Sequence, residues 1–416
     1  MTFLVSLCLL GGLQSEITPE SFGAKADGVT DDTIAFSQAL AKGGTVVLAA
    51  GKTYRVKAPL TLRSNLTLKS SDQAKSAIVK LDTPSSGTTG VISSKTTGVT
   101  VCGIDFEGLT GDFNSLLALS EVDKFSLVQC KLSKNAKRSS ALLRLKDSTN
   151  VSVTNCDFEK GYVAIHALGN SRDLKFEQNT MHDLMQYGVW LQGSATTTSE
   201  RVQILNNDIW DIKRSPGAIG SPGATAGHLI YVQIGENVGK ERHKQIDVVG
   251  NRLKGIKTAF TQGGNADLVE YCDVDGGNVS ENVAEHGGDV GIAVIRSKGI
   301  LVEKNKAGYN NTNGIVLWEA SYCKVLKNEA YNNNQDRLKQ WGERAAKGGI
   351  RVMARTGTSD NNELTGNKCW DDQAVKTQDY GIYLMKSAKN TKLGANDLNG
   401  NKFGPIKDDT KGMFGG

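Results

Sequence analysis

The sequence lacks several features that would point to common function classes. No run of Lys or Arg accompanies its formal charge of +5, which argues against a nucleic-acid partner. No Cys-x-x-Cys pair or Cys/His spacing suggests zinc. No segment after residue 15 is apolar enough to cross a membrane. Only 6 prolines accompany 47 glycines, a balance that suits a chain turning tightly at regular intervals.

The first 15 residues contain a short apolar run, Phe3–Leu10, where a secretory signal would lie. The run has no preceding Lys or Arg, and Leu13-Gln-Ser15 is a poor cleavage site. We expect residues 1–15 to be a signal peptide and the protein to be secreted and extracellular. Six cysteines would then remain, and disulfides and buried thiols are both open for them: Cys102, Cys130, Cys156, Cys272, Cys323 and Cys369.

One short phrase recurs between about Val151 and Asn396: an apolar residue, any residue, a second apolar residue, two more residues and then Asn. The recurring asparagines are Asn179, Asn207, Asn251, Asn282, Asn305, Asn328, Asn367 and Asn396. Their spacing never falls below 23 residues, and each excess reads as an insertion into a fixed unit. This is the pattern of a solenoid.

Each repeat also carries a second run with period two, such as Tyr187–Gln192 or Asn313–Trp318. Two or three short strands per coil, with no helical period between them, predict an all-β, single-stranded, right-handed parallel β-helix. We expect the asparagines to form an internal hydrogen-bonded ladder at one corner. Cys130 and Cys156 hold the same position in two earlier coils.

The start of the chain has the pattern of a cap. An apolar stripe at Ala35, Phe36, Ala39 and Leu40 predicts a helix over Asp31–Ala41, capped by Thr30 or Asp31. Gly43-Gly44 should end the helix, and residues 45–51 should open the first strand. We therefore expect a single domain over residues 16–416, with a cap at 19–51 and coils over about 52–403.

The phrase Phe22-Gly-Ala-x-Ala-Asp-Gly-x-Thr-Asp-Asp-Thr, followed by a strand that leads into Ala-Gly-Lys-Thr-Tyr54, resembles the N-terminal cap of the pectate-lyase superfamily of β-helix proteins. That resemblance implies processing of a carbohydrate polymer by a lyase, a hydrolase, an epimerase or a tailspike depolymerase. The polygalacturonase-type motifs and the Asp-Pro-His motif of alginate epimerases are absent, which argues against a hydrolase or an epimerase of those particular kinds.

Aligning the second strands of the coils places Val163, Val189, Ile230, Phe260, Ile292, Ile315, Ile350 and Ile382 inward. The outward row then reads Ala164/His166, Trp190/Gln192, Tyr231/Gln233, Thr261, Ala293/Ile295, Val316/Trp318, Arg351/Met353 and Tyr383/Met385. A solvated face would carry Lys, Glu, Thr and Ser, whereas aromatics, amides and arginines bind sugars. The alternative is that long loops cover this row as a secondary core.

The two longest insertions should wall this row. They place loops over Lys213–Gly227 and Asn332–Gly348, on one edge of the predicted groove between Val163 and Arg355. His166, His182, His228 and His286 fall in or just before the groove strands, and only His243 lies elsewhere.

These residues suit β-elimination on a uronate-containing polymer, for which alginate is our first expectation and pectate-like uronans the second. The predicted catalytic residues are Tyr231 or Tyr187 as acid, Lys213, His228 or His182 as base, and Gln192, Gln233 or Arg296 against the substrate carboxylate. The predicted substrate-binding residues are His166, Trp190, Trp318, Glu319, Arg351 and Arg355.

Two other functions stay open. A two-carboxylate glycoside hydrolase could draw its acids from Asp208, Asp211, Glu285, Asp289 and Glu319. A non-catalytic carbohydrate-binding β-helix would keep the aromatic row without chemistry. No cofactor is required for any of these functions, although Asp273 with Asp275, or Asp371 with Asp372, could bind Ca²⁺. The expected partner is an acidic polysaccharide, and the sequence does not indicate an oligomeric state.

Overall fold

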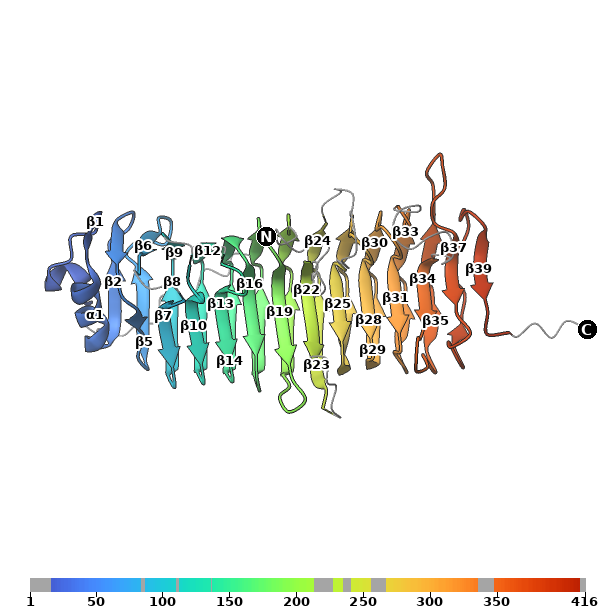
Figure 1. The fold of residues 1–416 in the computed structure, drawn as a ribbon, viewed down its shortest axis with the longest axis horizontal. Coiled ribbons are helices and arrows are strands. Elements are labelled where there is room, and N and C mark those ends of the chain that lie inside the picture. Colours follow the sequence, from blue (N-terminus) through green and yellow to red (C-terminus); the bar gives the residue numbers. More distant parts are fainter. Residues whose placement is uncertain are drawn as a thin grey trace, which may run out of the picture. The chain divides into compact units, whose positions relative to one another are not determined.

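The computed structural model describes residues 16–83, 87–109, 112–135, 137–212, 227–234, 241–255, 267–335 and 348–411. Its strands form three parallel sheets of 13 strands each, which follow one another in turn along the chain (Figure 1). This architecture confirms the predicted parallel β-helix. Within the described residues, no helix is long and apolar enough to cross a membrane.

The strand bounds show how each coil contributes to the three sheets. Sheet A contains β2 (Gly44–Leu48), β5 (Leu66–Ser70), β8 (Thr97–Cys102), β11 (Asp123–Val128), β14 (Thr149–Thr154), β17 (Arg172–Glu177), β20 (Glu200–Leu205), β23 (His243–Val249), β26 (Val274–Ser280), β29 (Lys298–Glu303), β32 (Lys324–Leu326), β35 (Glu363–Thr365) and β38 (Lys392–Leu393). Sheet B contains β1 (Asp27–Asp31), β3 (Thr53–Val56), β6 (Ala77–Leu81), β9 (Ile104–Gly108), β12 (Lys131–Asn135), β15 (Asp157–Gly161), β18 (Thr180–His182), β21 (Asp208–Trp210), β24 (Arg252–Lys254), β27 (Val283–Glu285), β30 (Lys306–Gly308), β33 (Glu329–Tyr331) and β36 (Lys368–Trp370). Sheet C contains β4 (Leu60–Thr61), β7 (Thr89–Ser94), β10 (Ser115–Ser120), β13 (Ala141–Lys146), β16 (Val163–Leu168), β19 (Tyr187–Gly193), β22 (His228–Ile234), β25 (Val269–Cys272), β28 (Ile292–Ile295), β31 (Ile315–Trp318), β34 (Gly348–Met353), β37 (Tyr380–Leu384) and β39 (Gly404–Asp408).

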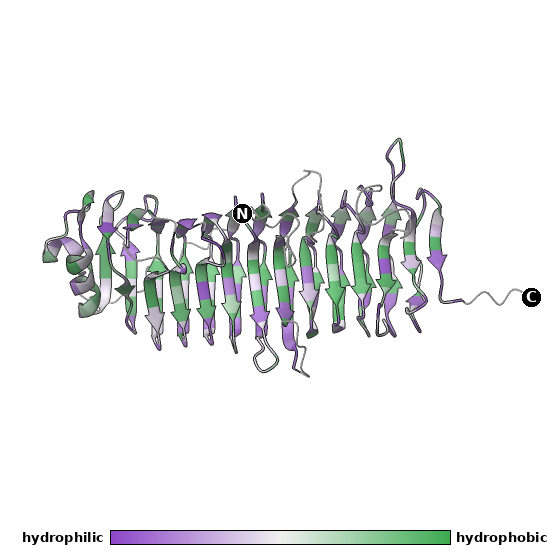
Figure 2. Cartoon of the chain, in the orientation of Figure 1, coloured by the Kyte–Doolittle hydropathy of each residue, from purple (hydrophilic) through white to green (hydrophobic). Residues whose placement is uncertain are grey.

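The chain divides into two compact units. The first comprises Met1–Ile165 with Asp173–Thr180, and the second comprises His166–Arg172 with Met181–Gly416. In both units the strands carry most of the hydrophobic residues and the turns most of the hydrophilic ones (Figure 2). Alternate strand residues are buried because successive side chains in a strand point to opposite faces.

The first unit begins with the predicted cap. A 3-10 helix, η1 (Pro19–Phe22), precedes α1 (Thr33–Lys42), which lies beside β1 and β2 (Figure 1). The stripe of α1 is buried as expected, and the ring of Phe36 lies 5.6 Å from that of Tyr54. Asp31 accepts the N–H of Thr33 at 3.0 Å, while Asp32 accepts the N–H groups of Lys25 and Ala26. Two adjacent carboxylates therefore fix the start of the helix and the turn before it.

The corner between sheets A and B of the first unit uses thiols before it uses amides. Cys130 donates to the carbonyl of Val101, and Cys156 donates to that of Leu127. In the next coil, Asn179 donates to the carbonyl of Val153 at 3.0 Å and accepts the N–H of Cys156 at 2.9 Å. The thiols thus occupy the ladder position, as the repeat predicts, and all six cysteines of the described residues are free and buried.

The second unit contains the predicted asparagine ladder. From Asn207 through Asn251, Asn282, Asn305, Asn328 and Asn367 to Asn396, each side-chain amide donates to the carbonyl oxygen of the next at 2.9–3.0 Å. The same carbonyl oxygens accept the backbone N–H of the preceding asparagine. Because both amide groups are satisfied in each coil, burying these polar side chains fixes the corner without leaving unpaired groups.

A second, shorter ladder was not predicted. Asn310 donates to Asn333 at 3.0 Å, Asn333 to Gln378 at 2.9 Å, and Gln378 to Asn401 at 2.8 Å. It lies after the strands of sheet B. It escaped the sequence analysis because it has only four members, one of them a glutamine, and 45 residues separate Asn333 from Gln378.

Candidate functional site

The outward row of sheet C in the second unit has almost the predicted register. Trp190 pairs with Tyr231, Gln192 pairs with Gln233, and Trp318 pairs with Met353. One assignment was wrong: Phe260 and Thr261 lie outside the described residues, and β25 is formed by Val269–Cys272 instead. Val269 takes the inward position between Ile230 and Ile292, so Glu270 follows Tyr231 in the outward row.

The row divides into two parts of different chemistry. From β16 to β25 it presents rings, amides and a carboxylate. Further along, Cys272, Val290, Ala293, Ile295 and Val316 form a buried apolar cluster, against which Trp318 and Met353 pack. This apolar cluster interrupts the predicted binding face, and the alternative of a secondary core holds for the stretch that it occupies.

Aromatic rings from β16, β19 and β22 meet in this part of the row. Trp190 stacks on His166, with ring centres 4.1 Å apart and planes within 3°, and lies 6.3 Å from Tyr231 at 14°. Tyr231 also stacks on His228 at 4.7 Å. The indole Nε1 of Trp190 is buried, and no described residue accepts its hydrogen bond. A partly exposed ring face with an unused donor beside it is the kind of surface that takes a sugar.

Two amides lie beside these rings. Nε2 of His166 and Oε1 of Gln192 are 2.8 Å apart, so the imidazole can donate to the amide oxygen. That contact orients the amide nitrogen of Gln192 away from His166. Gln233 is the register neighbour of Gln192 and is likewise partly exposed. The pair offers adjacent N–H donors of the kind that neutralise a carboxylate.

An acid-histidine group borders Tyr231. Nε2 of His228 lies 3.3 Å from a carboxylate oxygen of Glu270, and Nδ1 lies 3.2 Å from the backbone oxygen of Asp267. Burial, followed by the negative charge of Glu270, raises the pKa of Tyr231, so its phenol keeps its proton at neutral pH. The pKa of Asp267 is raised well above its ordinary value by burial and then by the charges of Asp289 and Glu270.

Glu270 and Asp267 were missed in the sequence analysis. The run Val269-Glu-Tyr-Cys272 has the alternation of a strand, which was the available signal, but Phe260 was taken as the inward residue of that coil. His228, Asp267 and Glu270 bring one ligand atom each within 4.8 Å of one another. Two carboxylates and an imidazole suit a divalent cation in chemistry, although Asp267 is only 6% exposed.

Several predicted catalytic residues have other contacts. Tyr187 is 3% exposed, and its hydroxyl accepts a hydrogen bond from the side-chain amide of Gln186 at 3.1 Å. It is therefore a buried residue that packs against the rings of the row. Arg296 holds the buried carboxylate of Asp273 through two hydrogen bonds of 2.9 and 2.8 Å. These bonds raise the pKa of Arg296, and its charge is already neutralised.

Two of the predicted histidines lie on a different sheet. His182 ends β18 and stacks on Trp210 at 4.9 Å, and His286 follows β27 and stacks on Tyr309 at 5.2 Å. Both strands belong to sheet B, so these two histidines come just before strands of the row and do not lie on sheet C themselves. Lys213 and most of the two predicted loops, residues 213–226 and 336–347, lie outside the described residues.

The remaining predicted binding residues form a basic and aromatic group beyond the apolar cluster. The guanidinium of Arg355 lies 4.4 Å from the ring centre of Trp318, and that of Arg351 lies 5.2 Å from Tyr383. Arg351 is only 9% exposed, its Nε has no partner, and it forms no ion pair with any residue that the structure describes. Burial lowers its pKa. A buried guanidinium without a counter-ion is costly unless a ligand supplies one.

Two of the acids predicted to serve in hydrolysis or calcium binding, Glu319 and Asp371, are hydrogen-bonded to backbone N–H groups. Glu319 accepts the N–H groups of Arg355, Thr356 and Gly357, which lower its pKa although partial burial opposes them. Asp371 accepts the N–H groups of Gln373, Thr377 and Gln378 at 2.6–3.0 Å. These contacts make both carboxylates structural.

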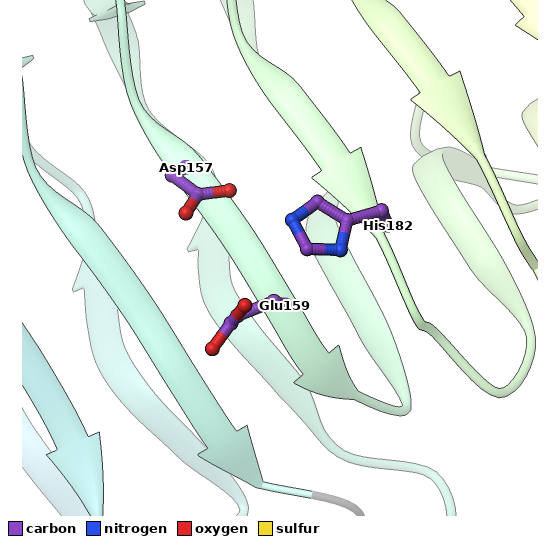
Figure 3. A group of neighbouring side chains, drawn as sticks. All are labelled: Asp157, Glu159 and His182. Atoms are coloured by element: carbon purple, nitrogen blue, oxygen red, sulfur yellow. The ribbon is translucent and has the colours of Figure 1, made fainter.

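In the first unit, Lys131 forms ion pairs with two acidic side chains, Asp157 and Glu159. Asp157 and Glu159 point to the same side of β15 (Figure 3), and the ammonium of Lys131 lies 3.0 and 3.2 Å from their oxygens. Lys160 adds a second ammonium 3.3 Å from Glu159, so both carboxylates have cationic partners within that unit and we assign them a structural role.

Fold and register define a right-handed parallel β-helix protein. Residues 19–209 match the family model "Rhamnogalacturonase A/epimerase, pectate lyase-like", and residues 227–403 match "Right handed beta helix region". The chain thus belongs to the pectate lyase-like right-handed β-helix proteins, as its cap sequence suggested. None of the curated proteins matches it in sequence.

Solved structures resemble the chain in fold. The N-terminal fragment of bacteriophage phi29 gene product 12 is 14% identical, with a TM-score of 0.62, covering 91% of this chain and 66% of that one. The catalytic unit of an α-1,3-glucanase from Streptomyces thermodiastaticus is 15% identical, with a TM-score of 0.55, covering 95% and 70%. Tailspike protein 3 of bacteriophage CBA120 is 12% identical, with a TM-score of 0.51, covering 91% and 59%. At these identities the likeness concerns the fold.

Proposed function

We propose that this protein is a secreted polysaccharide lyase that cleaves a uronate-containing polymer by β-elimination, with alginate as the first substrate to test and pectate-like uronans as the second. The observation that carries the proposal is the row of Trp190, Tyr231 and Glu270 with two amides beside it. The pectate lyase-like family match and the fold shared with an α-1,3-glucanase and a tailspike support an enzyme that acts on a polysaccharide.

The residues divide the work of β-elimination. Gln192 and Gln233 donate N–H groups to the uronate carboxylate, which acidifies the proton on the adjacent carbon. His228 is the candidate base on this row, and to remove that proton its ring must turn toward the substrate and free one nitrogen from Glu270 or from the backbone oxygen of Asp267. Tyr231 gives its proton to the glycosidic oxygen as the C–O bond breaks, leaving a carbon-carbon double bond. The raised pKa of Tyr231 keeps the phenol protonated until the leaving oxygen takes the proton.

The acidic nature of the substrate has a second support. Arg351 is buried without a carboxylate partner among the described residues, and Arg355 lies on the adjacent Trp318. A polymer that carries one carboxylate per sugar would supply the missing counter-ion. A neutral glucan would leave the guanidinium unpaired.

One observation favours hydrolysis as a second candidate. Asp267 and Glu270 are neighbouring carboxyl groups, and the raised pKa of Asp267 would keep it protonated, as a general acid requires. However, Asp267 is buried and its Oδ1 accepts the N–H of Val290 at 3.0 Å. Because a general acid must reach the leaving oxygen, the partly exposed Tyr231 is the better candidate.

The test is incubation with alginate, polygalacturonate and a neutral glucan, with ultraviolet absorbance and reducing ends followed together. We expect absorbance and reducing ends to rise in parallel on one acidic polymer and to stay flat on the glucan. An increase in reducing ends without an increase in ultraviolet absorbance would show that the reaction is hydrolysis and not elimination. Binding with neither signal would leave a carbohydrate-binding β-helix.

A further inference from the structure

A pocket on sheet B has no part in the reaction proposed above. Its volume is about 540 Å³, and it lies over β21, β24 and β27 of the second unit. Its lining residues are Asp208, Ile209, Trp210, Arg252, Leu253, Lys254, Val283, Glu285 and His286. Strands in a sheet are about 4.8 Å apart, so the pocket spans about 10 Å, which is the length of two sugar rings. Its volume lies in the range of small-ligand sites.

One wall of the pocket is an exposed indole. Trp210 is 38% exposed, and its ring is parallel to that of His182 within 9°. His182 belongs to β18, whereas the pocket extends from β21 toward β24 and β27 on the other side. The imidazole therefore covers one face of the indole and fixes its plane, and the opposite face borders the pocket. A fixed, open indole face is suited to stacking on a sugar ring.

The opposite wall is held by a tyrosine that reaches across two strands. The hydroxyl of Tyr331 donates to Oε1 of Glu285, and its ring lies over Gly308 on the intervening strand. A Cβ at Gly308 would lie 2.3 Å from that ring, so only glycine lets Tyr331 reach Glu285. The contact fixes the carboxylate and leaves Oε2 as an acceptor for a hydroxyl group. His286 continues this wall and is stacked on Tyr309.

The charges of the pocket indicate the class of ligand. Asp208 pairs with Arg252 at 3.5 Å, and Glu285 is bound by Tyr331. Lys254 is exposed and forms no ion pair with any residue in the described ranges. Its register neighbour on β27 is Glu285, but no ion pair joins the two side chains, so among the described residues the ammonium of Lys254 has no anionic partner. A carboxylate on the ligand would complete it.

We propose that this pocket is a second, non-catalytic binding site for a uronate-containing oligosaccharide. One sugar ring stacks on Trp210, a carboxylate binds Lys254, and a hydroxyl group donates to Glu285. The site lies on sheet B, whereas the proposed catalytic row lies on sheet C, so it holds the polymer without touching the reacting bond. The uronate character of the ligand rests on the proposed function, whereas the stacking site on Trp210 does not.

The experiment measures binding of hexasaccharides from alginate and from polygalacturonate, with a neutral glucan hexasaccharide for comparison, by titration calorimetry. The protein carries Tyr231→Phe so that the ligands stay intact. We expect Trp210→Ala and Lys254→Ala each to weaken binding of one acidic hexasaccharide about tenfold. Tyr322→Ala is the control, because Tyr322 is likewise an exposed aromatic residue but lies outside the pocket and makes no contact with Tyr331 or Glu285 in the described structure.

The outcomes separate this proposal from the proposed function. Unchanged affinity in both Trp210→Ala and Lys254→Ala would overturn the second site, even if the wild-type protein cleaves the polymer. Binding that depends on Trp210 and Lys254 in a protein without lyase activity would support the site and reject the reaction. If the neutral hexasaccharide binds equally well and its binding also depends on Trp210, the claim that the ligand is acidic is wrong. In the otherwise wild-type protein, Lys254→Ala should leave the cleavage rate of a trisaccharide within twofold.

Discussion

Two rows of polar side chains run along the coils of the second unit, and they differ in how completely they are satisfied. In the interior row, from Asn207 to Asn396, the amides donate and accept in a regular chain of hydrogen bonds. In the outward row of sheet C, the indole N–H of Trp190 and the Nε of Arg351 are buried and have no hydrogen-bond partner among the residues that the structure describes. Buried polar groups that are hydrogen-bonded stabilise a fold, whereas buried polar groups without hydrogen bonds reduce its stability unless a ligand supplies their partners. We therefore assign structure to the first row and binding to the second.

Removing the hydroxyl group of Tyr231 should have the largest effect on the cleavage rate. Tyr231→Phe keeps the ring and its stacking but deletes the proton that the leaving oxygen needs, so the cleavage rate should fall about 10²–10⁴-fold. The melting temperature should change little. Tyr322→Phe, at an exposed position, is the control. A variant that cleaves at the wild-type rate would remove Tyr231 from the mechanism.

Replacing the unpaired guanidinium should weaken substrate binding next. Arg351→Gln should raise KM for the acidic polymer by roughly ten- to a hundredfold, since a hydrogen bond to a charged group contributes about 1.5–3 kcal/mol. Thermal stability should stay the same or increase, because a buried unpaired charge is removed. Loss of stability with unchanged KM would place Arg351 with the structural residues.

The interior row makes the opposite prediction. Asn305→Ala removes the acceptor of both N–H groups of Asn282 and should lower the free energy of unfolding by about 1–3 kcal/mol. The rate per folded molecule should stay unchanged. Denaturant titration beside activity measures both, and the exposed Asn399→Ala is the matched control. Reduced turnover at full stability would contradict the division between the rows.

Trp190 should show a smaller effect on binding. Trp190→Ala removes the stacking surface between His166 and Tyr231, and polymer affinity should fall about tenfold. Circular dichroism should show the fold intact. If affinity is unchanged both here and in Trp318→Ala, the sugar-binding surface lies elsewhere.

Asp267 gives a test by pH. Its pKa is raised in the folded state, so its contribution to stability is present below the pKa of the unfolded chain and is lost as pH rises toward the folded value. Asp267→Asn abolishes this loss, so the melting temperature of the variant should gain on the wild type between pH 4 and pH 7. A difference that is independent of pH would show that Asp267 is not buried as an acid.

The sequence allowed the interior row to be predicted because a buried amide at a fixed corner imposes a period on the residues before it. The outward row was predicted wherever a strand of sheet C has at least four alternating residues. It failed at Phe260, where an insertion precedes the true strand Val269–Cys272. The sheet on which His182 and His286 lie could not be predicted, because β18 and β27 have three residues each and show too little alternation to indicate sheet B.

The central claim is that the outward row breaks the glycosidic bond by elimination, and mass balance tests it most directly. A uronate hexasaccharide is digested by the wild-type protein and the two products of each cut are weighed by mass spectrometry. Elimination predicts that their masses sum to that of the substrate, with one product carrying a double bond, and that Tyr231→Phe forms neither product at a comparable rate. Products whose masses exceed the substrate by one water would contradict the account.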